Sequence, residues 1–214
     1  MGRGRKKQEN PETAARILEA AEAHFATHGL AGARTEEIAG AAKVNKAMLF
    51  YYFKNKKHLH RAVLENLFRQ FRENVYSLQR TADSPRRQLL GLVAGYFDFL
   101  GSHPNYPRLM QREAMEASTN FKWIVGEYLN PFHSEVMKAI RSGIAEGDIR
   151  GVDPEHTAFS ILGMTTSYFA AAPILSKIAG RDLLTAPAVA ARRAAILDFL
   201  EHGLIAERCG TAAG

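Results

Sequence analysis

The chain lacks the features that mark secreted, disulfide-bonded and membrane proteins. Its 214 residues include a single cysteine, Cys209, so no intrachain disulfide can form and a reducing compartment fits. No apolar run approaches the roughly 20 residues that a transmembrane helix needs. The opening segment MGRGRKKQEN is basic but has no apolar stretch behind it, unlike a secretory signal. These absences predict a cytoplasmic protein that makes no membrane contact.

Signatures of catalysis are scarce as well. His58 and His60 are two residues apart, so on a helix they point in different directions and cannot share a metal ion. Arg112 and Glu113 are adjacent, but no nucleophile or base accompanies them. No glycine loop that could hold a phosphate precedes a helix, because residues 143–151 have the composition of a turn. We therefore expect no enzyme, no cofactor and no metal site.

Acidic side chains are missing from one stretch of the chain, and positive charge gathers there. No Asp or Glu lies between Glu37 and Glu65, whereas residues 1–80 hold 15 Lys and Arg against 8 Asp and Glu. Residues 81–214 hold 13 against 14, so the net charge of +6 belongs to the first third. A single lysine is most simply a solvated surface charge, but this cluster indicates a surface that contacts phosphate. The basic residues of the acid-free stretch are Lys43, Lys46, Lys54, Lys56, Lys57 and Arg61.

Helical periodicity dominates the sequence. Ile17, Leu18, Ala21 and Phe25 form one apolar stripe of a helix that we expect from about Pro11 to Gly29. From Lys56 a longer helix is predicted, because apolar residues recur there at steps of four: Leu59, Val63, Leu67, Phe71 and Val75. Further on, Pro131 predicts a kink or a restart within a helical pattern. No pair of alternating runs predicts a hairpin, so the fold class is all-α.

The stretch from Thr35 to Phe53, TEEIAGAAKVNKAMLFYYF, predicts two short helices joined by a tight turn. The Thr35 hydroxyl can cap the first helix, Lys43 and Val44 make the turn, and Asn45 caps the second helix. A helix-turn-helix places the N-terminal residues of its second helix in the DNA major groove. The chain therefore begins with a three-helix helix-turn-helix head.

The residues of this predicted reading helix can be assigned by their chemistry. Asn can pair with adenine through two hydrogen bonds, Lys can donate to guanine, and Ala can contact a thymine methyl group. The predicted base contacts are Asn45, Lys46, Ala47 and Met48, with Tyr51 one turn later. The predicted phosphate contacts are Thr35, Tyr52, Lys54 and Lys56. Tyr51 and Tyr52 could instead be packing residues, and Leu49 and Phe53 are expected to seat the helix.

At these positions the chain resembles the TetR family of bacterial transcriptional regulators. The matching residues are Ala23-His24-Phe25, His28-Gly29, Thr35, Ile38-Ala39, Ala42, Val44, Leu49, Tyr52-Phe53 and Asn55-Lys56. The chain departs from the family pattern at four positions: Lys43 stands where Gly is usual, Asn45 replaces Ser, Ala47 replaces Gly, and Phe50 replaces Tyr. Lys43 either strains the turn or means that the turn needs no positive φ. Phe50 lacks a hydroxyl that often contacts phosphate in the family.

The resemblance implies a C-terminal helical bundle for ligand binding and dimerisation. In the family the last two long helices, here His156–Lys177 and Ala188–Ala206, form a four-helix bundle with their partner copies. The expected dimer residues are Phe159, Leu162, Thr166, Phe169, Ala195 and Leu200. The expected residues of an apolar ligand pocket are Phe97, Arg112, Trp123, Tyr128, Phe132 and Tyr168, although each could be plain core.

Together these features predict four segments: a flexible basic arm over 1–10, the helix-turn-helix domain over 11–58, the ligand-binding and dimerisation domain over 59–207, and a flexible tail over 208–214. The arm could enter a minor groove through its basic residues or could be a solubilising tail: Arg3, Arg5, Lys6 and Lys7. The predicted function is a repressor that binds a palindromic operator in double-stranded DNA as a homodimer. A small apolar or amphipathic ligand would release it. The alternative is a helical interaction protein without sequence-specific DNA binding.

Overall fold

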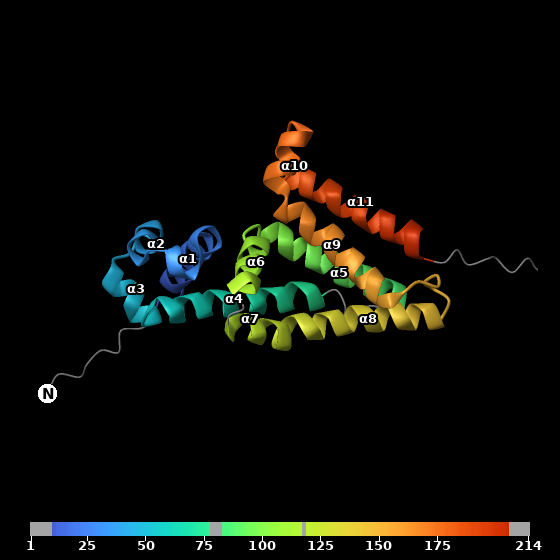
Figure 1. Cartoon of the computed structure of the whole chain (residues 1–214), viewed down its shortest axis with the longest axis horizontal. Helices are drawn as coiled ribbons and strands as arrows, with labels where there is room; N and C mark the ends of the chain where they lie inside the picture. The colour runs from blue at the N-terminus through green and yellow to red at the C-terminus, as the bar shows by residue number, and fades with distance from the viewer. Residues whose placement is uncertain (1–9, 78–82, 117–118, 206–214) are drawn as a thin grey trace, which may run out of the picture.

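The computed structural model describes residues 10–77, 83–116 and 119–205, and apart from one isolated β-bridge the regular structure in these ranges is helical. Figure 1 shows a small head of α1 to α3 at one end of the molecule, joined by α4 to a larger body. The helices are α1 Pro11–Gly32, α2 Thr35–Ala41, α3 Lys46–Phe53, α4 Lys56–Ser77, α5 Pro85–Ser102, α6 Tyr106–Glu116, α7 Thr119–Ile124, η2 Val125–Leu129, α8 Asn130–Ala145, α9 Pro154–Ala170, α10 Ala172–Ala179 and α11 Ala186–Leu204. The predicted all-α class is confirmed.

Helix α1 begins and ends as its sequence dictates. The Asn10 side-chain oxygen accepts a hydrogen bond from the Glu12 backbone N–H at 3.0 Å, and Pro11 occupies the first turn. Gly29 has φ 68° and ψ 176°, which interrupts the helix before a last turn that reaches Gly32. The expected end at Gly29 is therefore a break inside a slightly longer element. The residue is Gly because a side chain would be strained at this φ.

Helix α4 contacts both parts of the molecule. Near its start it packs against α1 and α3, and further along it packs against α5. The contact with α5 is close because Gly95 has no side chain. A Cβ atom at Gly95 would lie 3.0 Å from the Asn74 carbonyl oxygen and 3.0 Å from the Val75 Cα. Backbone therefore meets backbone near the C-terminal end of α4.

The segment before Pro131 is a π-helical turn rather than a sharp bend. Residues Val125–Leu129 form η2, and the Asn130 N–H bonds to the Val125 carbonyl. Pro131 then lies in the first turn of α8, where its missing N–H costs least. Figure 1 shows α7 and α8 lying roughly in line, so the expected kink or restart takes the form of a restart.

The prediction of one helix over His156–Lys177 is wrong. The chain breaks at Ala171, and α9 and α10 meet at an angle of 73°. The cause is Pro173, which lacks an N–H and is accommodated in the first turn of a new helix. Of the helices described, none is by itself long and apolar enough to cross a bilayer, although the bent pair α9 and α10 passes that test jointly.

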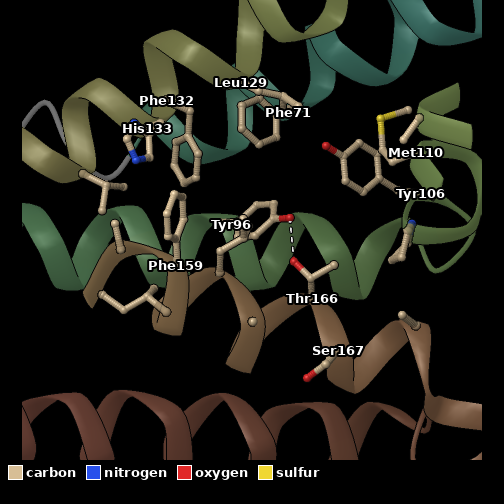
Figure 2. A pocket seen from close by; sticks show the side chains of 18 of the residues that line it. Phe71, Tyr96, Tyr106, Met110, Leu129, Phe132, His133, Phe159, Thr166 and Ser167 are labelled. Atoms are coloured by element: carbon tan, nitrogen blue, oxygen red, sulfur yellow. Dashed lines mark hydrogen bonds between the residues drawn. The ribbon is translucent and has the colours of Figure 1, made fainter. Parts of the chain in front are cut away.

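The helices of the body line a half-open cavity of about 720 Å³ (Figure 2). Its walls come from α4, α5, α6, α7, η2, α8 and α9, which bring together residues that are up to 99 positions apart in the chain, from Phe71 to Ala170. Several walls are aromatic. The rings of Phe71 and Phe132 meet edge to face with centroids 5.3 Å apart, and those of Tyr96 and Phe132 are also 5.3 Å apart.

Candidate nucleic-acid interface and ligand cavity

The first turn of α3 is exposed to solvent, and the helix is anchored in the core directly after it. Leu49 is fully buried, whereas the four preceding residues, predicted to read bases, are all exposed: Asn45, Lys46, Ala47 and Met48. Tyr51 follows one turn after Ala47 and is 56% exposed. Phe53 is half-buried and packs against the core. This is the geometry that a reading helix requires, although contact of these residues with DNA stays a prediction.

Asn45 is an N-cap in the structure. Its side-chain oxygen accepts a hydrogen bond from the Met48 backbone N–H at 2.7 Å, as the sequence predicted. Pairing with adenine through two hydrogen bonds needs that same oxygen as an acceptor. An amide oxygen has two lone pairs, so the cap bond leaves it able to accept a second hydrogen bond, and the expected pairing of Asn45 with adenine stays a prediction.

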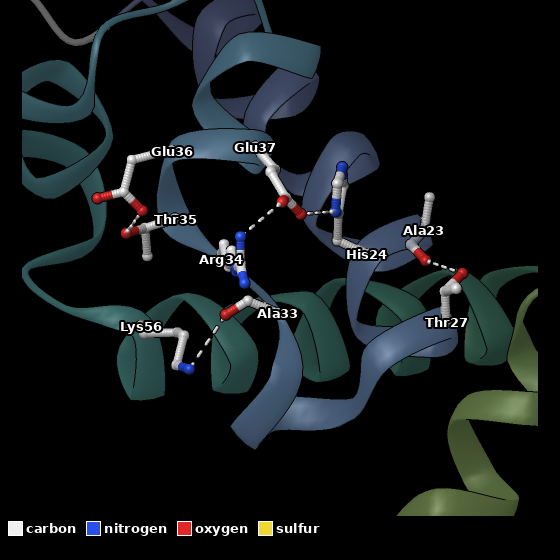
Figure 3. A network of polar contacts seen from close by, with 9 residues as sticks. All are labelled: Ala23, His24, Thr27, Ala33, Arg34, Thr35, Glu36, Glu37 and Lys56. Carbon is white, nitrogen blue, oxygen red and sulfur yellow. Dashed lines mark hydrogen bonds and ion pairs between the residues drawn. The ribbon is translucent and has the colours of Figure 1, made fainter.

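One positive charge of the head, that of Lys46, is paired with an acidic side chain, which the sequence alone did not reveal. The Lys46 ammonium donates to the Glu36 carboxylate at 2.5 Å, which joins α3 to α2. The hydrogen bond from Lys46 is the main cause that lowers the pKa of Glu36 to about 2. The Thr35 hydroxyl donates to the same carboxylate at 3.2 Å (Figure 3). The expected capping of α2 by Thr35 is wrong, because Thr35 is the first helical residue.

Two of the predicted phosphate contacts hold the head together. The Lys56 ammonium donates to the Ala31 and Ala33 carbonyls at 3.0 and 3.1 Å, where α1 ends (Figure 3). The Tyr52 hydroxyl accepts a hydrogen bond from the Asn10 backbone N–H at 3.0 Å. Lys54 is exposed and lies just after α3. Of the four predicted phosphate contacts, Lys54 is thus the one whose side chain faces solvent.

The turn between α2 and α3 resolves the question raised by Lys43. Its φ is 55°, a positive value that L-residues other than Gly rarely adopt. Lys43 therefore carries backbone strain where the family pattern has Gly. Lys54, at the other end of α3, also has a positive φ of 57°.

Arg112 joins the head to the body and does not line the cavity. Its guanidinium donates to the Ala26 and Thr27 carbonyls of α1 at 2.9 and 2.5 Å. Its neighbour Glu113 is buried and lies 3.1 Å from the His60 ring nitrogen on α4. Helix α6 is thus bonded to both α1 and α4. The prediction of Arg112 as a pocket residue is wrong, because its donors are used on backbone carbonyls.

Of the six predicted pocket residues, Phe132 lines the cavity. Phe97 is buried against Phe169, with ring centroids 5.0 Å apart, and the Tyr168 hydroxyl donates to the Leu183 carbonyl at 2.7 Å. Trp123 packs under the Arg61 guanidinium, and Tyr128 borders a separate, polar groove beside α4. These four predictions are wrong for this cavity. Each side chain lies on another face of its helix, which aromatic composition alone does not indicate.

The polar groups of the cavity were not predicted as ligand contacts. The Tyr96 hydroxyl lies 3.0 Å from the Thr166 hydroxyl, and burial raises the pKa of Tyr96 to about 12. Tyr106 is also buried, which raises the pKa of its hydroxyl well above the usual value. His133 also lines the cavity, with a ring nitrogen that is buried and has no hydrogen-bond partner among the described residues, and the remaining polar side chains of the lining are Gln111, Asn130 and Ser167. Thr166 was expected at a dimer interface, but it faces the cavity.

The expected dimer surface is partly exposed and partly core. Phe159 and Leu162 on α9 are 51% and 45% exposed, and Ala195 on α11 is exposed too. Phe169 and Leu200 are buried inside the single chain, so the prediction that they contact a partner is wrong. Other large apolar side chains are exposed on α10, on α11 and on the loop between them: Ile174, Ile178, Leu184 and Phe199.

One group of described side chains has a spacing that a metal ion could bridge. Ligand atoms of His24, His28 and Glu37 all lie within 4.8 Å of one another. Arg34, however, lies 3.8 Å from the Glu37 carboxylate, and His24 lies 3.8 Å from it on the other side (Figure 3). A bound cation would face the Arg34 guanidinium, so we interpret the group as an ion-pair network between α1 and α2.

Two predicted segments lie outside the described residues. These are the basic arm, of which Asn10 is the one residue that the structure describes, and the tail over 208–214. The base and phosphate contacts proposed for the arm through Arg3, Arg5, Lys6 and Lys7 are therefore not assessed.

Comparisons with known proteins match two separate segments of the chain. Residues 17–63 match the family described as "Bacterial regulatory proteins, tetR family", and residues 85–200 match "Tetracyclin repressor-like, C-terminal domain". Among curated proteins, the HTH-type transcriptional repressor SCO4008 of Streptomyces coelicolor is 31% identical over 170 residues, which cover 79% of this chain and 84% of that protein.

Solved structures share the fold. The ketosteroid transcriptional regulator KstR2 of Mycobacterium tuberculosis superposes with a TM-score of 0.77 at 19% identity, covering 95% of this chain and 100% of that one. AibR, solved in complex with isovaleryl coenzyme A and operator DNA, superposes with a TM-score of 0.64 at 24% identity, covering 74% and 86%.

Proposed function

The chain belongs to the TetR family of bacterial regulatory proteins, and from that membership we propose that it is a DNA-binding transcriptional repressor. The observation that carries the proposal is the exposed first turn of α3, mounted on the fully buried Leu49. Residues 11–58 would form the DNA-binding unit and residues 59–207 the ligand-binding and dimerisation unit. The family and the matched relatives are transcriptional regulators rather than enzymes.

Base contacts would come from the exposed side of α3. Lys46 can donate to guanine acceptors once DNA competes with Glu36 for its ammonium. Ala47 and Met48 offer apolar contact to thymine methyl groups. Tyr51, exposed one turn later, would reach a base edge or sugar. Lys54 is the best-supported phosphate contact because its side chain is exposed beside this helix.

The molecule would bind its operator as a homodimer. Two heads must stand about 34 Å apart to reach successive major grooves on one face of DNA, and a two-fold axis supplies such a pair. The interface would lie on α9, α10 and α11, where large apolar side chains are exposed in the single chain. Phe159, Leu162 and Ala195 are proposed for this interface, and Phe159 and Leu162 border the cavity as well. Phe169 and Leu200 are buried within the single chain and are left out of it.

The cavity in the body would hold the small molecule that releases the repressor from DNA. Its volume of about 720 Å³ falls within the usual range for ligand sites. Helix α6 supplies Tyr106 and Met110 to the cavity wall. The same helix bonds to α1 through Arg112 and to α4 through Glu113. A ligand that moves α6 would therefore shift the head, and binding of ligand and DNA would oppose each other.

Selection of bound duplexes from a random DNA library tests the proposal. We expect the full chain to enrich an inverted repeat with half-sites about one helical turn apart, and to bind it with a steep salt dependence. Substitution of Ala47→Glu should abolish the enrichment, whereas Glu73→Gln, on α4 well beyond the head, should preserve it. If no sequence is enriched and binding is absent at low salt, the chain is a helical interaction protein instead.

A further inference from the structure

The cavity walls contain no group that could neutralise a charged ligand by a permanent opposite charge. Among the described residues that line it, none is Asp, Glu, Lys or Arg. An ionised carboxylate or ammonium loses its hydration on entering such a site, and that loss is large unless an opposite charge replaces the water. The composition of the wall therefore favours an uncharged ligand.

The polar side chains that line the cavity are uncharged amides, a histidine and hydroxyls: Gln111, Asn130, His133, Tyr96, Tyr106, Thr166 and Ser167. Figure 2 shows the hydroxyls of Tyr96 and Tyr106 directed toward its middle, with Thr166 beside Tyr96. Tyr96 and Thr166 are 3.0 Å apart, so one of the two donates to the other and a single hydrogen remains for a ligand. Burial keeps both tyrosines protonated, and therefore donors, throughout the neutral range.

Tyr106 is the least satisfied of these hydroxyls. Its side chain is 3% exposed, and its hydroxyl has no hydrogen-bond partner within the part of the chain that the structure describes. A hydroxyl that faces the cavity with its donor unused can bond to a ligand, so a ligand oxygen that accepts from it would be selected. Most of the remaining lining is apolar or aromatic and can contact a flat or aliphatic body, with Phe132 and Phe159 on opposite walls.

We propose that the ligand of this cavity is an uncharged, largely apolar molecule whose carbonyl oxygen accepts a hydrogen bond from Tyr106, with the Tyr96–Thr166 pair as a second donor. The inference rests on the proposed function, in which this cavity is the effector site. It assigns specificity to Tyr106, because that hydroxyl distinguishes a ligand with an acceptor from an apolar molecule of the same shape.

His133 defines the competing possibility. Its buried ring nitrogen lacks a partner among the described residues, and its ring stacks on Phe159 with centroids 5.8 Å apart. If this imidazole were protonated on binding, it could pair with an anionic ligand instead. A test of the proposal must therefore compare a neutral and an anionic ligand with the same body.

Three pyrene compounds provide that comparison: 1-acetylpyrene, pyrene-1-carboxylate and pyrene. Fluorescence titration of the full chain should give 1-acetylpyrene the tightest binding, about tenfold or more ahead of the carboxylate, because the carboxylate loses its hydration. Tyr106→Phe should weaken binding of 1-acetylpyrene about fivefold and leave pyrene unchanged, which separates the hydrogen bond from packing. Tyr76→Phe, a tyrosine outside this cavity, is the matched control and should change neither.

The proposal is overturned if the carboxylate binds as tightly as the ketone, if Tyr106→Phe leaves the ketone unaffected, or if none of the three compounds binds. Binding of the selected DNA duplex, measured on the same samples without ligand, keeps the two proposals apart. A chain that binds the duplex but shows any of these results remains a repressor with a different ligand class.

Discussion

The His60 ring nitrogen lies 3.1 Å from the Glu113 carboxylate, and both side chains are almost completely buried between α4 and α6. Phe25 of α1 packs its ring edge to face on His60, with centroids 4.7 Å apart. Three helices from the head and the body therefore meet at one polar pair. A buried pair contributes most clearly when one partner is removed, because the other is left without compensation.

Glu113→Ala should lower the free energy of unfolding by about 3–5 kcal/mol, since it leaves His60 buried without this carboxylate. Urea denaturation followed by circular dichroism measures the effect. The matched control is Glu73→Ala, which removes an exposed ion pair with Arg69 on α4 and should cost about 0–1 kcal/mol. Equal effects of the two substitutions would show that the buried pair has no special role.

Lys43→Gly should stabilise the protein by about 1 kcal/mol, because Gly adopts a positive φ without the steric cost that an L-side chain bears. Thermal unfolding provides the measurement. Lys138→Gly on the exposed side of α8 is the control and should be destabilising by about 1 kcal/mol, since there Gly replaces a helical residue. The strain interpretation fails if Lys43→Gly lowers the melting temperature.

Substitutions of Lys54 and Lys56 are predicted to have different effects, the first on DNA affinity and the second on stability, although the two residues are only two positions apart. Lys54→Ala should weaken binding to all duplexes and reduce the slope of log affinity against log salt by about 1, as loss of one phosphate contact does. Lys56→Ala should instead lower stability by about 1–3 kcal/mol, because its ammonium bonds to two carbonyls at the end of α1. A reduced salt slope for Lys56→Ala with unchanged stability would reverse this assignment.

Glu36→Gln should increase affinity for DNA at low salt. The substitution removes a negative charge beside the reading helix and frees Lys46 from its ion pair. Fluorescence anisotropy with a labelled duplex at two salt concentrations should show the gain and its decrease as salt rises. Glu73→Gln, remote from the head, should leave affinity unchanged. Weaker binding by Glu36→Gln would mean that the pair positions Lys46 for its base.

Glu22 predicts a pH dependence of stability. Burial raises the pKa of Glu22 to about 7 from a usual value of 4.5. The folded state therefore binds the proton more tightly, and stability falls as pH rises from 4.5 to 7. Glu22→Gln should stabilise the protein by up to about 3 kcal/mol at pH 8 and have little effect near pH 4.5. Urea denaturation at pH 8 and at pH 4.5 measures this difference. An increase in stability that is the same at both pH values would contradict the explanation.

The head followed closely from the sequence because its signals are local. Periodicity located α1, the turn and cap residues between Thr35 and Phe53 located α3, and Asn45 was correctly assigned as a cap. The bonds of Lys56 and the pair of Lys46 with Glu36 were missed, since they join residues on different helices. No pattern within one helix indicates them.

The cavity was predicted less well, for a related reason. Which side chains line it depends on how the helices of the body rotate against each other, and aromatic residues occur on several faces. Phe132 was identified, whereas Trp123 and Tyr168 proved to face neighbouring helices. The break at Ala171 was missed because three alanines favour a helix there, although Pro173 gave a signal that could have been used.

The missing side chain at Gly95 sets the point about which the head can move. Because the backbones of α4 and α5 are in contact there, the C-terminal end of α4 is held against α5, and the rest of α4 can tilt about this contact. At 1.5 Å per residue the helix is roughly 30 Å long, so a tilt of about 5° at Asn74 would displace Lys56 by about 2–3 Å. A small change in the body would thus produce a larger displacement at the reading helix. A larger residue at position 95 would change how far α4 can tilt, although it contacts neither DNA nor ligand.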